Sequence, residues 1–268
     1  MKVAAIQMVS GTRLDDNLAQ ARALLEQARE AGAELAVLPE YFCFMGRHDA
    51  DKLRIAEPPG AGPIQAFLSR AAADFGLWVV GGTLPLATSD PAHAANATLV
   101  FGPDGQPVAR YDKIHLFRYD NGRERYDEAA VLAAGDTPTA FTLTDAQGQA
   151  WRVGLSVCYD LRFPELYRLL GADLLLVPAA FTHTTGQAHW EVLLRARAIE
   201  NQAYVLASAQ GGSHENGRQT WGQSMVIDPW GVVLAQRASG AGVVVADIAM
   251  SRLQQVRQQL PALQHRRF

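Results

Sequence analysis

The chain has 268 residues, 49% of them hydrophobic and 19% charged, so it can bury a large core and we expect one domain over residues 1–268. Its net charge of −3 and its lack of a Lys/Arg-rich block argue against nucleic acid or a membrane as partner. The sequence contains only two cysteines, shows no signal-peptide pattern and has no apolar run of the roughly 20 residues that span a bilayer. We therefore expect a soluble, reduced, cytoplasmic protein.

Strand-like and helix-like runs alternate along the first third of the chain. The apolar periodicity predicts strands and helices in the order strand 2–8, helix 14–31, strand 35–38, helix 63–75 and strand 77–82. A hairpin follows over 96–111, with Pro103-Asp104-Gly105 as its turn, so the sheet is predicted to be mixed. We interpret 84–96 and 118–137 as long loops that are available for function.

The second half repeats the alternation of strands and helices. Its patterns predict strand 151–157, helix 164–170, strand 173–177, helix 187–201, strand 204–207 and a strand meander over 220–247. Two halves of similar element order predict an α/β protein with two sheets packed face to face and helices outside.

Cys158 ends the predicted strand 151–157 and precedes Pro164, a residue that suits the first turn of a helix. On such a strand-to-helix turn, the backbone N–H groups after the thiol point toward whatever the sulfur attacks. This is how a nucleophile and half of an oxyanion hole are built. A lone thiol in an apolar run is more commonly a core residue, so the turn alone does not show whether Cys158 is a nucleophile.

Three other polar residues stand where strands end or in the loop beyond. Glu40 follows the strand 35–38, Lys113 closes the hairpin, and Glu128 lies in the loop after it. Each of them alone is more commonly solvated than catalytic. Because strand ends cluster at one edge of an open α/β sheet, these side chains and Cys158 can meet in one pocket.

Amide hydrolysis needs a thiol, a carboxylate and an ammonium group. A carboxylate, Glu40, takes the proton of the thiol, provided that its pKa is raised by partial burial. The ammonium of Lys113 and the N–H of Tyr159 then stabilise the oxyanion of the tetrahedral intermediate. Once the amine has left, Glu40 activates the water that hydrolyses the thioester.

The chain resembles the nitrilase (carbon–nitrogen hydrolase) superfamily from end to end in three motifs: Leu38-Pro39-Glu40, Tyr111-Asp112-Lys113-Ile114-His115-Leu116-Phe117 and Gly154-Leu155-Ser156-Val157-Cys158-Tyr159-Asp160-Leu161-Arg162-Phe163-Pro164-Glu165. The resemblance implies that Glu40 is the base, Lys113 stabilises the intermediate, Cys158 is the nucleophile and Glu128 positions the lysine and substrate. It also implies a four-layer α-β-β-α sandwich of two mixed sheets, no metal or organic cofactor, and a homodimer or larger homo-oligomer.

Residues 181–191, 194–202 and 260–267 resemble the branch of deaminated glutathione amidase and ω-amidase, which act on α-keto acid amides. That branch implies a substrate pocket lined by Arg162, Phe181 and Thr185, in which the guanidinium grips a carboxylate. An ion pair of Arg162 with Asp160 or Glu165 is an equal alternative.

The expected function is therefore a thiol amidase that converts deaminated glutathione to 2-oxoglutarate and cysteinylglycine. The alternatives are an ω-amidase acting on 2-oxoglutaramate and an N-carbamoyl amine hydrolase. Two alternatives come from other classes of protein. The intact set of Glu40, Lys113, Glu128 and Cys158 argues against a catalytically silent scaffold on the same fold. The lack of a resolving cysteine argues against a redox thiol protein.

The remaining candidates are weaker. Arginines at 118, 123 and 125 replace the family's Asp-rich loop and favour an anionic substrate, although exposed arginines are commonly just solvated. Cys43 is predicted to pack beside the pocket, and His115 to lie beside Lys113. We expect 189–191 to open the long helix, Gly81-Gly82 and Gly211-Gly212 to form turns, and no histidine to be spaced for zinc.

Overall fold

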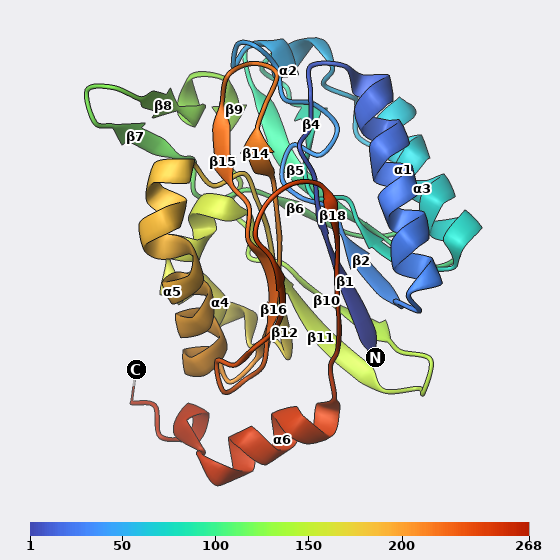
Figure 1. The fold of residues 1–268 in the computed structure, drawn as a ribbon, viewed down its shortest axis with the longest axis vertical. Helices are drawn as coiled ribbons and strands as arrows, with labels where there is room; N and C mark the ends of the chain where they lie inside the picture. The colour runs from blue at the N-terminus through green and yellow to red at the C-terminus, as the bar shows by residue number, and fades with distance from the viewer. Residues whose placement is uncertain (268) are drawn as a thin grey trace.

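The computed structural model describes residues 1–267, so that residue 268 of the expected domain 1–268 lies outside the described residues. Two mixed sheets lie face to face, with α1 (Leu14–Glu30) and α3 (Pro63–Phe75) on one side and α4 (Pro164–Leu170) and α5 (His183–Asn201) on the other (Figure 1). This arrangement confirms the predicted α-β-β-α sandwich. None of the helices in residues 1–267 is long and apolar enough to cross a lipid bilayer.

The first sheet carries the N-terminal third of the chain and one strand from its end. Its order is β18-β1-β2-β3-β5-β4, with β6 and β9 also paired to β5. The strands are β1 (Lys2–Gln7), β2 (Leu35–Val37), β3 (Trp78–Val80), β4 (Leu84–Ala87), β5 (Ala94–Phe101), β6 (Pro107–Asp112), β9 (Leu132–Ala133) and β18 (Gly242–Asp247).

The second sheet has the order β10-β11-β12-β13-β16-β17. Two short ribbons, β7 with β8 and β14 with β15, stand at the upper end of the molecule (Figure 1). The strands are β7 (Arg118–Asp120), β8 (Arg125–Asp127), β10 (Ala140–Thr144), β11 (Ala150–Leu155), β12 (Leu174–Ala179), β13 (Tyr204–Ala209), β14 (Gly211–Ser213), β15 (Gln219–Trp221), β16 (Ser224–Ile227) and β17 (Val233–Arg237).

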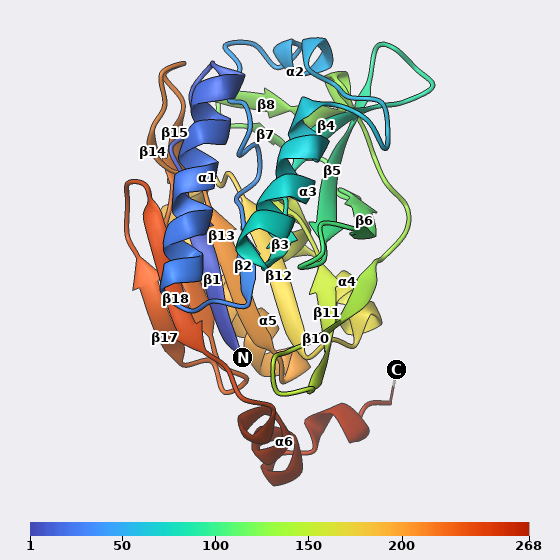
Figure 2. The same ribbon diagram turned by 90° about the vertical axis from the view of Figure 1, so that its right-hand side faces the viewer.

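The core follows from the two-residue period of the strands. On β1, Val3 and Ala5 face the second sheet, and Ala4 and Ile6 pack in a separate cluster with residues of α1 and α3. A strand buried on both faces reads as a continuous apolar run, which is why 2–8 was recognisable. Figure 2 shows α1 and α3 lying across the first sheet and α6 (Met250–Gln259) below both sheets.

Several sequence predictions were wrong in detail. The loops 84–96 and 118–137 contain strands β4, β7, β8 and β9, the start of β5, and the short helix η1 (Glu128–Ala130). Gly211-Gly212 lies in strand β14 and not in a turn. The meander 220–247 is divided, because its last strand, β18, pairs with β1 in the first sheet. Helix α6, strand β10 and the short helix α2 (Asp51–Arg54) were not predicted.

The long helix begins earlier than its apolar pattern suggests. Thr182 caps α5, since its side-chain oxygen accepts the N–H of Thr185, so that residues 189–191 lie inside the helix and do not open it. Gly186 is needed there, because a Cβ would lie 2.3 Å from the Trp221 side chain. Poor helix formers in this first turn hid its start from sequence reasoning.

Candidate active site

Cys158 opens the short helix η2 (Cys158–Arg162) directly after β11, as the strand-to-turn pattern predicted. Its φ of 50° lies in the left-handed region, which costs a non-glycine residue of order 1 kcal/mol and clusters at functional sites. The side chain is buried, with 8% of the residue exposed. The thiol is therefore held in a conformation that the surroundings must enforce.

Asp160 enforces this conformation, and sequence reasoning did not identify its role. Its buried carboxylate accepts the N–H of Val157 at 2.8 Å and the hydroxyl of Tyr111 at 2.7 Å. The backbone N–H and the Nδ1 of His115 lie 3.1 and 2.7 Å from its other oxygen. His115, predicted to lie beside Lys113, has Asp160 as its partner, and its ring stacks on Phe163 with centroids 3.7 Å apart.

Lys113 lies just after β6 and is completely buried. Its ammonium is 2.9 Å from Glu40 Oε1 and 2.8 and 3.1 Å from the two oxygens of Glu128. The backbone of Lys113 is fixed by Gly135, whose N–H donates to its carbonyl at 2.9 Å. A Cβ on Gly135 would lie 2.2 Å from the carbonyl oxygen of Asp112, so only glycine allows this approach.

Glu40 follows β2 and is held by donors from both sheets. Oε1 accepts from Lys113 and, at 3.0 Å, from Asn96 of β5, and Oε2 accepts the N–H of Ala180 after β12 at 2.9 Å. Asn96 was missed by sequence reasoning. An amide side chain inside the mostly apolar strand 94–101 was the available signal.

Glu128 is oriented by two further donors, the hydroxyl of Tyr41 at 2.8 Å and the N–H of Phe117 at 2.7 Å. Tyr41 has a φ of 56°, and its backbone N–H donates to Thr83 at 2.9 Å. Nothing in the sequence singled out Tyr41, although it directly follows Glu40. The four polar residues predicted to meet are thus brought together from β2, β6, η1 and η2.

The charges in this cluster follow from burial and from mutual contact. Burial disfavours the ammonium of Lys113, but the charges of Glu128 and Glu40 outweigh it and raise its pKa. Burial also works against the carboxylate of Glu128, yet Lys113 and Lys52 hold its pKa below the usual range. Burial and the charge of Glu40 raise the pKa of the Cys158 thiol, and Lys113 opposes them. The resting site therefore holds an ammonium ion and a protonated thiol beside a carboxylate.

A small cavity lies over this cluster, in which only about 10 Å³ is open to the centre of a water-sized molecule. Seven of the eight predicted site residues line it, while Lys113 lies behind its two carboxylate partners. These seven are Glu40, Glu128, Cys158, Tyr159, Arg162, Phe181 and Thr185. This free volume holds about one water molecule, so the cavity is a narrow one.

Comparison with known proteins agrees with this geometry. The family model described as carbon-nitrogen hydrolase matches residues 2–258. This chain belongs to the carbon–nitrogen hydrolase family. It is a hydrolase that acts on carbon–nitrogen bonds other than peptide bonds, on the nitrilase-superfamily fold.

Relatives of the hydrolase match it along nearly its whole length. A protein of Synechocystis sp. named deaminated glutathione amidase is 45% identical and covers 99% of this chain, which spans 97% of that relative. The human protein named Omega-amidase NIT2 is 36% identical, with coverages of 99% and 95%. The crystal structure of the NitFhit protein of C. elegans superposes with a TM-score of 0.89 at 39% identity, and covers 99% of this chain, which spans 65% of NitFhit.

In this hydrolase, Arg162 faces the cavity and makes no ion pair with Asp160 or Glu165, so that alternative is wrong. The guanidinium carbon lies 5.8 Å from the ring centre of Tyr159 and 5.4 Å from that of Phe181. Its nitrogens are 3.3 Å from His189 Nδ1. No carboxylate within residues 1–267 lies within ion-pair distance of Arg162. Its charge is therefore available to an anionic ligand.

Arg218, in the loop between β14 and β15, is a cavity residue that sequence reasoning missed. Its guanidinium carbon lies 5.2 Å from the ring centre of Tyr126, and one terminal nitrogen donates to the carbonyl of Ala180 at 3.3 Å. Its Nε is buried and has no hydrogen-bond partner. An unsatisfied buried donor at a cavity wall indicates a place for an acceptor from a ligand.

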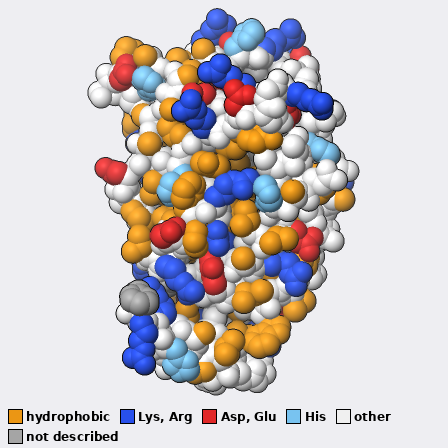
Figure 3. Space-filling model, turned by 90° about the vertical axis from the view of Figure 1, so that its left-hand side faces the viewer, with side chains coloured by type: hydrophobic (Ala, Val, Ile, Leu, Met, Phe, Trp, Pro, Cys, Tyr) orange, Lys and Arg blue, Asp and Glu red, His pale blue; other side chains and the backbone are white. Residues whose placement is uncertain are grey.

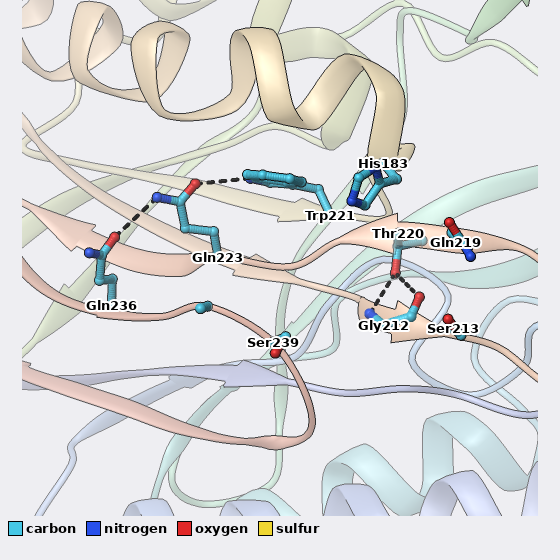
Figure 4. Close-up of a pocket in the computed structure, with 10 residues that line it drawn as sticks. His183, Gly212, Ser213, Gln219, Thr220, Trp221, Gln223, Gln236 and Ser239 are labelled. Carbon is cyan, nitrogen blue, oxygen red and sulfur yellow. Dashed lines mark hydrogen bonds between the residues drawn. The ribbon is translucent and has the colours of Figure 1, made fainter.

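A second hollow lies beside the N-terminus of α5 and is lined mostly by polar, uncharged side chains (Figure 4). Trp221 donates to Gln223 at 2.9 Å, and Gln223 donates to Gln236 at 3.1 Å. None of the residues that line it carries a carboxylate or a thiol. Within residues 1–267, no three or more His, Cys, Asp or Glu side chains are grouped to hold a metal ion.

Proposed function

We propose that the hydrolase cleaves an amide through a thioester on Cys158, with Glu40 as the base and Lys113 as the oxyanion donor. The observation that carries this proposal is the buried ammonium of Lys113, 2.9 Å from Glu40, at the cavity that Cys158 lines. Glu128 fixes that ammonium from its other side at 2.8 Å. Positioning and charge stabilisation of this kind each contribute several kcal/mol to catalysis.

The reaction follows from these positions. Glu40 removes the proton of Cys158, and the sulfur attacks the amide carbon, so that the carbonyl oxygen becomes negative. Lys113 and the N–H of Tyr159 stabilise this oxygen. The first hydrogen bond of η2 runs from Asp160 N–H to Val157 at 3.0 Å, so the N–H of Tyr159 precedes it and needs no partner inside the helix.

The intermediate collapses when the carbon–nitrogen bond breaks. The amine takes its proton from Glu40 and leaves an acyl group on the sulfur. Glu40 then removes a proton from a water molecule, whose oxygen attacks the thioester carbon. The carbon–sulfur bond breaks, Glu40 returns the proton to the sulfur of Cys158, and a carboxylic acid is released. One amide and one water give one acid and one amine, and the enzyme returns to its starting state.

Deaminated glutathione is the proposed substrate, and 2-oxoglutarate and cysteinylglycine are the products. The name of the 45% identical Synechocystis relative supports this choice. The guanidinium of Arg162, between Tyr159 and Phe181, is suited to the carboxylate of an α-keto acid. The 36% identity to the human Omega-amidase NIT2 favours 2-oxoglutaramate as the second candidate substrate.

The experiment that tests this function is 2-oxoglutarate release from deaminated glutathione and, separately, from 2-oxoglutaramate. We expect a higher kcat/KM for deaminated glutathione and no turnover by the Cys158→Ala variant, while Cys43→Ala serves as the matched control and retains activity. A higher kcat/KM for 2-oxoglutaramate would make the protein an ω-amidase. No turnover of either compound by the folded wild type would reject both substrates.

We further propose a homodimer that pairs through the face of α5. Large apolar side chains are exposed there and on the neighbouring elements, namely Leu169, Val192, Ile199, Trp230, Val232 and Leu234. Large exposed apolar side chains on neighbouring elements are typical of a protein–protein interface. Light scattering should give twice the chain mass, and Val192→Glu should reduce it to that of the monomer.

Two broader expectations also remain proposals. We propose that residues 1–268 act as one catalytic domain, which is supported by the single family match over 2–258. We propose a cytoplasmic location, since both cysteines are free and the mechanism needs a reduced thiol.

A further inference from the structure

A basic recess adjoins the catalytic cavity and is used by no step of the mechanism above. Its cationic wall consists of Arg47, Lys52, Arg125 and Arg218, with His48 beside them and Asp49 as the one acidic residue. Lysine and arginine side chains are spread over the face that carries β7, β8 and α5, and several lie at its α2 end (Figure 3). The recess therefore has an excess of positive charge.

The positive charges in this recess are only partly neutralised. Asp49 lies 3.4 Å from Lys52, and Glu215 lies 3.5 Å from Arg47. Within residues 1–267, Arg125 has no carboxylate at ion-pair distance, and the Nε of Arg218 is buried without a partner. A mobile surface arginine needs no partner, but a buried guanidinium nitrogen does. An anionic ligand would supply it.

Arg218 connects the recess to the chemistry, since it lines both the recess and the catalytic cavity. It lies on the side of the base, where it hydrogen-bonds to Ala180, whose N–H donates to Glu40. Arg162 instead packs on Tyr159 and Phe181. The two arginines thus mark different walls of the cavity.

The direction of the leaving group follows from the role of Glu40. Because Glu40 gives the amine its proton, the amine must face Glu40 and therefore the wall of Arg218. The cavity is narrow, with only about 10 Å³ open to the centre of a water-sized molecule, so an acyl group held on the Arg162 side leaves no room in it for a large amine. An amine larger than ammonia must therefore extend past Arg218 into the recess.

We propose that this recess binds a carboxylate at the far end of the leaving amine, so that the substrates are amides with an anionic group on each side of the cleaved bond. This assignment rests on the proposed function. It explains how one site can prefer an amide of a carboxylate-bearing dipeptide over a primary amide with the same acyl group, because only the former reaches Arg47 and Arg125.

The test uses two amides of the same 2-oxoglutaryl group, one that releases cysteinylglycine and one that releases cysteinylglycinamide, in which a neutral amide replaces the carboxylate. We expect the wild type to prefer the first. The R47Q/R125Q double variant should lower the ratio of the two kcat/KM values about tenfold, mainly through KM, which matches the loss of charged hydrogen bonds. Arg123→Gln, on the same loop but outside the recess, is the matched control and should keep the ratio.

The outcomes separate this assignment from the proposed function. Turnover of both amides with equal efficiency, or a ratio that the double variant does not change, would overturn the recess assignment and leave the proposed function standing. A parallel loss on both amides would likewise overturn it, since it would show a general structural effect. No turnover of either amide by the wild type would overturn both.

Discussion

Cys43 and Cys158 are both buried thiols, with 1% and 8% of each residue exposed, yet their surroundings differ completely. Cys43 packs among apolar residues below the first sheet, and its sulfur lies 3.9 Å from the carbonyl of Thr83. Burial raises its pKa, and the charge of Glu57 raises it further. Within residues 1–267 no cation offsets these two effects on the thiol, so Cys43 is a packing residue, as predicted.

Cys158 is equally disfavoured by burial but has what Cys43 lacks. Lys113 acts against burial and lowers the pKa of the thiol, and Glu40 lines the same cavity. The backbone also differs, because Cys158 has a φ of 50° and lies on a cavity wall. The comparison teaches that burial alone keeps a thiol protonated and unreactive. A fixed cation, a base and access to a cavity make it a nucleophile.

The largest expected effect separates the two thiols directly. Cys158→Ala should lower kcat/KM more than about 10³-fold because the covalent intermediate is lost. Cys43→Ala should change it less than about twofold and should lower the melting temperature only slightly, since few atoms leave the core. Steady-state rates and thermal melts measure both. If Cys43→Ala lost as much activity as Cys158→Ala, the conclusion that only Cys158 is a nucleophile would be wrong.

Glu40→Gln separates the reactivity of the thiol from turnover. Without the base, kcat/KM should fall about 10²–10⁴-fold. Because the charge of Glu40 raises the pKa of Cys158, its removal leaves Lys113 to favour the thiolate. Cys158 should then react with iodoacetamide at least as fast as in the wild type, and much faster than Cys43, as peptide mass spectrometry would show. Slow labelling of Cys158 equal to that of Cys43 would contradict an activated nucleophile.

Asp160→Asn tests how firmly the turn must hold Cys158. The variant loses the carboxylate that accepts from Val157 and Tyr111, and kcat/KM should fall about 10- to 100-fold. Asp145→Asn is the matched control, since this buried carboxylate accepts from Trp151 and Gln149 in the turn between β10 and β11, at the end of β11 away from Cys158. Both variants should melt earlier, but only Asp160→Asn should slow the alkylation of Cys158. Equal alkylation rates would show that Asp160 is only structural.

The smallest expected effect concerns acid stability. The folded pKa of Glu128 lies below its ordinary value of 4.5, so its contribution is complete above that pH and is lost as the pH falls through the folded pKa. Between pH 5 and 3 the wild type should therefore lose stability more steeply than Glu128→Gln, by at most about 1.4 kcal/mol per pH unit. Urea midpoints across this range measure the slope. The stability of the Cys43→Ala variant should fall with pH at the same slope as that of the wild type.

Sequence patterns predicted best those helices whose start and end are both marked by nearby residues. Helices 63–75 and 164–170 each begin with proline and end before a glycine in the left-handed conformation, and their predicted bounds agree with the structure. Strand β10 was missed because a short, half-exposed strand carries little apolar signal. The pairing of β18 with β1 was missed because partners more than 230 residues apart leave no trace in local periodicity.

The sequence by itself determined the family, the alternating elements and the turn that carries Cys158, since each depends on residues close together in the chain. Only the tertiary structure decided that Lys113 lies between Glu40 and Glu128, that Asp160 holds the turn, and that Arg162 faces the cavity. Tyr41, Asn96 and Arg218 likewise entered the site only when the sheets packed. The physical reason is that hydrogen bonds and charge contacts act over a few ångströms in space, between residues that the chain keeps far apart.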